Sequence, residues 1–260
     1  GCSMEINRLQ KELTDLYRTT MDYEFQKATY DNRMDSLRKT YEELLEETAS
    51  ACDASEGALE SLAACVPEYV AERLAAQPSR RKREMRSLDH KMNMVSYFLP
   101  LMGLAPTEKA QQLTQRMVEI WNEKMPEYKI GHSTYEGIRG GFKKGLFCYI
   151  TTAVCRSLDK PDDCYELTVL RRYRDDYLLI SDGGRELVEE YYNIAPTIVK
   201  RINREKNPGE IYRGIWQEYL RPCIRLIEEN RNEECREVYS RMVRKLEKDY
   251  MTGQQEGDER

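Results

Sequence analysis

The sequence lacks several features that would point to a definite activity. It contains only two histidines among 260 residues, and no uninterrupted apolar run reaches the roughly 18 residues that a membrane-spanning helix needs. Lysine and arginine total 41 against 46 acidic residues, which gives a formal net charge of −5. The excess of positive charge that displaces counterions from a phosphate backbone is therefore missing. These absences exclude a membrane span and argue against nucleic-acid binding.

The start of the sequence also lacks the pattern of a signal peptide, in which a charged segment precedes an apolar one. Seven cysteines follow Met4. An odd number of cysteines without a secretory signal is typical of reduced thiols, not of a disulfide framework. We therefore expect a cytoplasmic protein in which most cysteines are small buried residues. No motif indicates a cofactor, and a small-molecule ligand is unknown from the sequence.

Apolar residues recur at alternating spacings of three and four between Ile6 and Ala51. This period is typical of a coiled-coil seam. Neither glycine nor proline occurs between Met4 and Ala51, so the pattern predicts one unbroken helix of roughly 70 Å at about 1.5 Å per residue. Such a helix either pairs with another chain, as a homodimer or a docking surface, or folds back on later helices. A second apolar face over 59–74 supports folding back, and both alternatives stay open.

Five cations lie within the seven positions 80–86. They could bind an acidic partner or nucleic acid, and the plainer interpretation is a solvated helix start. Two more helices are predicted, over 84–102 and 107–125; Pro126 ends the second. Leu113, Met117 and Ile120 would share one face of that helix.

The pattern changes after residue 125, because five glycines fall between Gly131 and Gly145, a density typical of loops. We predict four parts: a region of long coiled-coil-like helices over 4–125, a glycine-rich linker over 126–146, a compact helical module over 147–250, and a disordered tail over 251–260. Helical patterns dominate both large parts. The predicted fold class is therefore all-α, with at most one short extended segment near 147–155.

Residues 148–153 read Cys-Tyr-Ile-Thr-Thr-Ala, and residues 170–175 read Leu-Arg-Arg-Tyr-Arg-Asp. Together they resemble the CFI-box C-terminal domain, a bacterial family named for Cys-Phe-Ile and a following run of small residues. The resemblance covers residues 147–202. Tyr149 stands where the family has phenylalanine, and residues 154–156 replace its usual aromatic residue and glycine. The resemblance implies a bacterial C-terminal module joined to varied N-terminal regions, and it implies no activity.

Cys148 lies where the linker meets this module, so an exposed thiolate there could act as a nucleophile with His132 as its base. The plainer interpretation is a packed small residue. Cys148, Cys155, Cys164 and His132 could also hold zinc. The sequence lacks the closely spaced cysteine pairs that are typical of structural zinc sites, so we expect no metal.

Arg171, Arg172 and Arg174 form a further candidate binding site. Helical spacing places Arg171 and Arg174 on one surface beside the buried stripe. Planar guanidinium groups suit an anion or an acidic partner. The alternative is ion pairing within the module, with the acidic residues of 162–166.

These features predict a cytoplasmic helical interaction or adaptor protein. Its coiled-coil-like region would dimerise or dock a protein partner, and its C-terminal module would resemble the CFI-box domain. A thiol-dependent enzyme with Cys148 as nucleophile, or a zinc-stabilised module, is the alternative.

Overall fold

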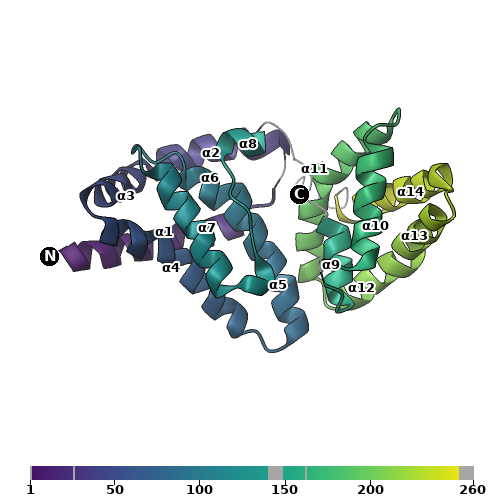
Figure 1. The fold of residues 1–260 in the computed structure, drawn as a ribbon, viewed down its shortest axis with the longest axis horizontal. Coiled ribbons are helices and arrows are strands. Elements are labelled where there is room, and N and C mark those ends of the chain that lie inside the picture. The colour runs from purple at the N-terminus through teal and green to yellow at the C-terminus, as the bar shows by residue number, and fades with distance from the viewer. Residues whose placement is uncertain (1, 26, 140–148, 162, 252–260) are drawn as a thin grey trace, which may run out of the picture. The chain divides into compact units, whose positions relative to one another are not determined.

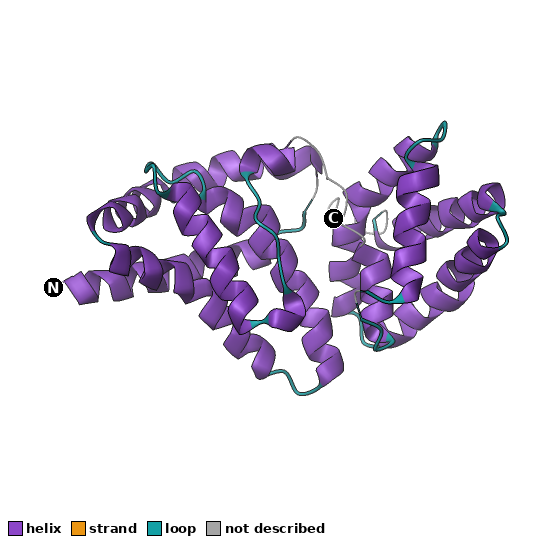
Figure 2. Cartoon of the chain, in the orientation of Figure 1, coloured by secondary structure: helices purple, strands orange, loops and turns teal. Residues whose placement is uncertain are grey.

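The computed structural model describes residues 2–25, 27–139, 149–161 and 163–251 (Figure 1). Throughout these residues the regular structure is helical, and no strand occurs (Figure 2). The predicted all-α fold class is confirmed. No helix in the described ranges is long and apolar enough to cross a membrane. Nearly all of the predicted tail over 251–260 lies outside the described residues.

The chain divides into two compact units, Gly1–Gly141 and Phe142–Arg260, called here the N-terminal unit and the C-terminal unit. The boundary falls inside the segment predicted to be a linker. Residues up to Arg139 nevertheless pack on the N-terminal unit, where Tyr128, Ile130 and Ile138 are buried. A linker beginning at residue 126 is therefore wrong for these residues, because their apolar side chains reach the core.

The N-terminal unit is built from helices of very different lengths. They are α1 (Cys2–Met21), α2 (Lys27–Thr40), α3 (Glu42–Ala54), α4 (Glu56–Ala75), α5 (Arg80–Asn93), the π-helix η1 (Met94–Phe98), α6 (Leu99–Met102), α7 (Ala110–Lys124), the 3₁₀-helix η2 (Pro126–Tyr128) and α8 (Tyr135–Arg139). In Figure 1, α4 lies beside α1 and α7, and it also contacts α3 and α5. It is the central helix of this unit.

The single long helix predicted for the first fifty residues is wrong. The chain leaves helical geometry after Met21, and Tyr41, with φ −106° and ψ 21°, separates α2 from α3. The break after α1 lets Phe25 enter the core, where its ring centroid lies 5.2 Å from that of Tyr30 and 6.2 Å from that of Tyr97. Burial of three aromatic rings favours the bent path, because their packing compensates for the lost helical hydrogen bonds.

The heptad pattern nevertheless identified the residues that are buried. Leu9, Leu13 and Leu16 of α1 have no exposed surface, and Met34 and Leu37 of α2 are nearly as buried. Their partners are other helices of the same unit. The apolar seam is therefore covered within the chain, as in the fold-back alternative.

The C-terminal unit is also a helical bundle. Its helices are α9 (Tyr149–Ser157), α10 (Tyr165–Tyr173), the π-helix η3 (Arg174–Leu178), α11 (Gly184–Arg204), α12 (Pro208–Ile215), the π-helix η4 (Trp216–Leu220), α13 (Arg221–Glu228) and α14 (Asn232–Tyr250). Helix α11 contacts α9 and α14, and α13 pairs with α14. Buried residues at their contacts include Val154, Ile198 and Met242.

Burial of the α1 seam predicts a selective loss of stability. Leu16→Ala should lower the free energy of unfolding of the N-terminal unit by about 2–5 kcal/mol, because it opens a cavity at a fully buried site. Met4→Ala on the same helix should change it by less than about 0.5 kcal/mol, since Met4 is 74% exposed. Urea unfolding followed by Trp121 fluorescence in a Trp216→Phe background measures both. Equal effects, or a midpoint that rises with protein concentration, would contradict the fold.

Substitution of alanine for two glycines of the C-terminal unit should change its stability in opposite directions. A Cβ at Gly184 would overlap the carbonyl oxygen of Leu178 and the Oγ of Ser181, so Gly184→Ala should cost about 1–3 kcal/mol. Gly214, inside α12, has open space around its Cα. Gly214→Ala should raise stability by about 0.5–1 kcal/mol. Thermal unfolding followed by circular dichroism gives the sign of each change.

Candidate functional site

Of the candidate nucleophile and its base, only the base, His132, lies in the described part of the chain. His132 lies on the surface of the N-terminal unit, where its Nε2 is 2.8 Å from the Oγ1 of Thr114. Cys148 lies outside the described residues. The Cys148–His132 pair therefore stays a prediction.

The candidate zinc ligands belong to two different units. His132 belongs to the N-terminal unit, whereas Cys155 and Cys164 belong to the C-terminal unit. Over the residues that the structure describes, no group of three or more histidine, cysteine or acidic side chains is arranged to hold a metal ion.

The three candidate arginines of the C-terminal unit have different surroundings. Arg172 is exposed and Arg171 is half-buried, but Arg174 retains only 6% of its surface. Arg174 begins η3, and its Nε donates a hydrogen bond of 2.9 Å to Oδ1 of Asp175. The shared surface predicted for Arg171 and Arg174 does not form, because Arg174 is drawn into the unit. Glu166, one of the acidic residues considered as partners for these arginines, instead pairs with the ammonium of Lys160 at 2.6 Å.

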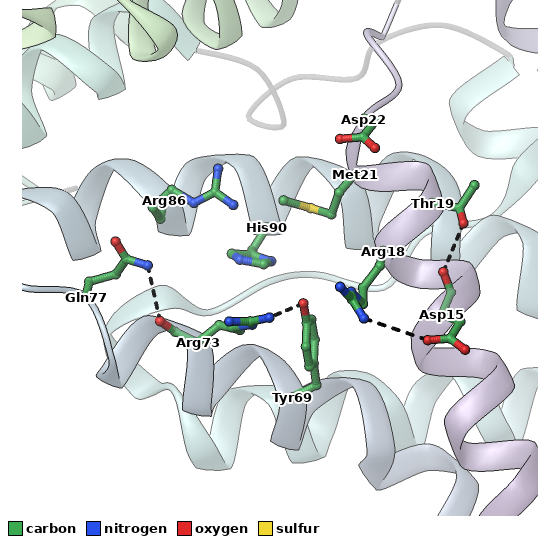
Figure 3. A pocket seen from close by; sticks show the side chains of 10 residues that line it. All are labelled: Asp15, Arg18, Thr19, Met21, Asp22, Tyr69, Arg73, Gln77, Arg86 and His90. Atoms are coloured by element: carbon green, nitrogen blue, oxygen red, sulfur yellow. Dashed lines mark hydrogen bonds and ion pairs between the residues drawn. The ribbon is translucent and has the colours of Figure 1, made fainter. Parts of the chain in front are cut away.

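A different arginine cluster lines a cavity of about 580 Å³ in the N-terminal unit. Figure 3 shows this cavity, called here the arginine pocket. Three helices surround it: α1 provides Arg18, α4 provides Tyr69 and Arg73, and α5 provides Arg86 and His90. The pocket thus combines residues that are up to 72 positions apart in the sequence (Arg18 to His90, 90 − 18).

The three arginines line the same pocket in two places: Arg18 and Arg73 lie near Tyr69, and Arg86 lies across the His90 ring from them in Figure 3. In Figure 3, Arg18 and Arg73 both point toward the hydroxyl of Tyr69, and Arg86 extends toward His90. Arg73 donates through Nε to the Tyr69 oxygen at 3.3 Å, and its guanidinium carbon is 5.4 Å from the centre of the Tyr69 ring. Tyrosine therefore orients Arg73 without neutralising it.

Three carboxylates, those of Asp15, Asp22 and Asp89, lie at or beside the same pocket, and they are not distributed evenly among the arginines. Arg86 donates to the buried Asp89 at 3.2 Å, whereas Arg18 and Asp15 are 3.9 Å apart and both exposed. Within the described ranges, Arg73 forms no ion pair. Like charges that face one cavity repel each other. An anion in the pocket would remove that repulsion and accept hydrogen bonds from the planar guanidinium groups.

His90 is nearly fully buried at the edge of the pocket, with 3% of its surface exposed. Its Nδ1 is 2.7 Å from the hydroxyl oxygen of Tyr17, and the two rings stack with an interplanar angle of 6°. Asn93, which is also on α5, holds Tyr17 as well, because its Nδ2 donates to the Tyr17 carbonyl at 2.9 Å. The Tyr17–His90 hydrogen bond therefore joins α1 to α5 beside the arginines.

This environment fixes the protonation of both rings. Burial lowers the pKa of His90 to about 3, and the positive charges of Arg86 and Arg73 act in the same direction. Burial raises the pKa of Tyr17 well above its usual value, so the phenol stays protonated. The Tyr17 hydroxyl also lies 3.3 Å from the His90 carbonyl oxygen, to which it can donate. His90 is thus a neutral ring held to Tyr17 through Nδ1.

Sequence reasoning missed this pocket. Arg86 was recognised only as part of the cationic run over 80–86, and Arg18 and Arg73 have no distinctive local pattern. His90 stands between Asp89 and Lys91 in a strongly charged helix, so the local sequence offered no signal that it is buried. Only the packing of α1 against α4 and α5 brings the three arginines to one place.

The low pKa of His90 predicts a specific pH dependence of stability. The unfolded chain protonates this histidine near pH 6.5, and the folded protein does so only near pH 3. Between these values the unfolded state binds one proton more, so stability falls by up to about 1.4 kcal/mol for each pH unit below pH 6.5. Above pH 6.5 the contribution is constant. His90→Gln should remove this part of the slope.

Urea unfolding between pH 7 and pH 4.5 measures the slope, and His132→Gln is the matched control. Burial lowers the pKa of His132 as well, so that variant should change the slope in the same direction by a smaller amount. An unchanged slope in His90→Gln would show that the buried imidazole titrates as it does in the unfolded chain.

No protein-family model, curated protein or solved structure matches the chain. The resemblance to the CFI-box domain therefore remains a prediction from the sequence, and function has to be inferred from the geometry of the pocket.

Proposed function

We propose that the protein is a helical interaction protein whose N-terminal unit binds a phosphorylated ligand in the arginine pocket. The observation that carries this proposal is the convergence of Arg18, Arg73 and Arg86, from three different helices, on one cavity. Arginine clusters of this kind recognise phosphate in many binding proteins, because each guanidinium fork can donate two parallel hydrogen bonds.

The donors favour phosphate over a single carboxylate. Besides the three guanidinium groups, the Tyr69 hydroxyl can donate. A phosphate monoester has three terminal oxygens and a charge near −2 at neutral pH, so it can accept from several of these groups at once. A carboxylate has two oxygens and one charge, so it can accept from fewer of these donors at once.

The pocket also has an acidic side, formed by Asp15 and Asp22 at the α1 edge. A cavity of about 580 Å³ is far larger than a phosphate group needs, so it has room for an organic portion of the ligand. The two carboxylates would accept hydrogen bonds from that part. The supported ligand class is a phosphate monoester whose organic portion carries hydroxyl or amino groups, either as a free compound or as a phosphorylated side chain of a partner protein.

The sequence predicted that a long helix over the first fifty residues would dimerise or dock a partner. In this proposal the arginine pocket has the binding role instead. The apolar positions of these fifty residues are buried within the N-terminal unit, so the docking function predicted for them is replaced by the pocket. The C-terminal unit keeps the role of an attached CFI-box-like module, with Arg172 as its exposed cation. The thiol-dependent enzyme centred on Cys148 remains an alternative prediction.

Isothermal titration calorimetry at low ionic strength tests the proposal. O-phosphoserine should bind more tightly than serine or acetate, and a phosphoserine peptide compared with inorganic phosphate separates the two sources of the phosphate. Arg73→Gln should weaken phosphoserine binding by about tenfold to a hundredfold, because a hydrogen bond to a charged group contributes roughly 1.5–3 kcal/mol.

Arg116→Gln is the matched control for charge. Arg116 is an arginine of the same unit, but it lies on α7 and pairs with Glu60, Glu119 and Glu123, outside the pocket lining. It should leave phosphoserine binding within about twofold of the original protein. Equal losses in both variants, or no loss in Arg73→Gln, would contradict a phosphate site in the arginine pocket.

A further inference from the structure

The arginine pocket extends from α1 to the connection between α4 and α5, residues 76–79. Asp15 and Asp22 line it on the α1 side, and Gln77 lines it at the connection. Figure 3 shows Gln77 on the side of the pocket opposite Asp15 and Asp22. The two carboxylates that line the cavity therefore both lie at one end of it.

The other end of the pocket leads to a run of cations. Arg80, Arg81 and Lys82 begin α5 and are all exposed, and Arg83, which follows them, is half-buried. The sequence has no acidic residue between Arg73 and Arg83. In the part of the chain that the structure describes, no ion pair involves Arg80, Arg81 or Lys82. These three cations are thus available to a partner.

Helix α5 connects this run to the pocket. Lys82 and Arg83 precede Arg86 by four and three positions, so all three lie along one side of the helix. Arg83 is anchored there, because its Nε donates to the carbonyl of Leu74 in the last turn of α4 at 3.2 Å. Lys82 is therefore the exposed cation on the side of α5 that faces the pocket through Arg86.

The distance from the pocket to the start of α5 suits a short peptide. Arg80 and Arg86 are six positions apart (86 − 80 = 6), which corresponds to about 9 Å along a helix. An extended chain covers that length with about three residues, at roughly 3.3 Å per residue. A phosphorylated side chain in the pocket and acidic side chains up to about three residues away would therefore reach the pocket and the start of α5 together.

We propose that the ligand of the arginine pocket is a phosphorylated segment of a partner protein, with acidic residues on one side of the phosphorylated residue. This inference rests on the proposed binding of phosphate in the pocket. The acidic residues contact Arg80, Arg81 and Lys82. The segment on the other side of the phosphate passes Asp15 and Asp22, where further acidic residues would be repelled.

Two features favour an acidic peptide over a free phosphorylated compound. The three exposed cations lie outside the lining of the pocket, so a small compound held in the cavity would not contact them. The start of α5 adds positive potential at the same place, because the first N–H groups of a helix have no partner within the helix. A negatively charged flank interacts with both.

Fluorescence anisotropy with labelled peptides and the full-length protein tests this inference. Two peptides place three glutamates directly before or directly after a central phosphoserine, and a third peptide has glutamine at all flanking positions. We expect one of the two acidic peptides to bind at least about fivefold more tightly than the glutamine peptide at low ionic strength, because three exposed ion pairs act in the same direction. Added salt should reduce this ratio.

Two double variants locate the preference. Arg81→Gln with Lys82→Gln should reduce the preference for glutamate to less than about twofold. It should leave binding of O-phosphoserine within about twofold, because neither residue lines the pocket. Arg38→Gln with Lys39→Gln is the matched control, since these residues are also an exposed arginine and lysine of the N-terminal unit, at the end of α2. The control should keep the preference for glutamate.

The outcomes separate this inference from the proposed function. If O-phosphoserine binds and Arg73→Gln weakens it, but the glutamate and glutamine peptides bind equally, the acidic partner is wrong and the phosphate site stands. If O-phosphoserine does not bind, both proposals are wrong. Equal gains from glutamates before and after phosphoserine would contradict a contact on one side. A single-stranded oligonucleotide that binds more tightly than the acidic peptide, and that is lost with Arg81 and Lys82, would overturn the inference in favour of nucleic acid.

Discussion

The hydrogen bond between Tyr17 and His90 is the contact on which the arginine pocket depends. It joins α1 to α5 in the core of the N-terminal unit, and Asn93 reinforces it through the Tyr17 carbonyl. A buried polar contact is costly when one partner is missing, so this pair restricts how the two helices can pack. Arg18 follows Tyr17 directly, and Arg86 lies one turn before His90. The Tyr17–His90 hydrogen bond therefore also sets the positions of Arg18 and Arg86 relative to each other.

The two units carry different chemistry. In the N-terminal unit, three arginines line a cavity together with Asp15 and Asp22, and Arg73 is oriented by the Tyr69 hydroxyl. In the C-terminal unit, the arginine of the candidate cluster that lies deepest, Arg174, is paired with Asp175. The proposed phosphate site and the proposed contact with an acidic peptide thus both belong to the N-terminal unit.

Local patterns predicted much of the fold. Helical periodicity predicted an all-α chain, and the heptad positions Leu9, Leu13 and Leu16 are indeed core residues. The same pattern failed to predict the break after Met21, because nothing in the local sequence forbids a continuous helix there. Packing of Phe25 against Tyr30 and Tyr97 determines the bend, and Tyr97 is contributed by a helix about seventy residues further along the chain (97 − 25 = 72).

The sequence by itself determined the helical class, the positions with buried faces and the inventory of reactive groups, because each depends on residue type and short-range spacing. The tertiary structure decided which groups meet. Arg18, Arg73 and Arg86 are unremarkable in sequence and become one site because α1, α4 and α5 pack together. Contacts of this kind are set by long-range burial, which local spacing does not encode.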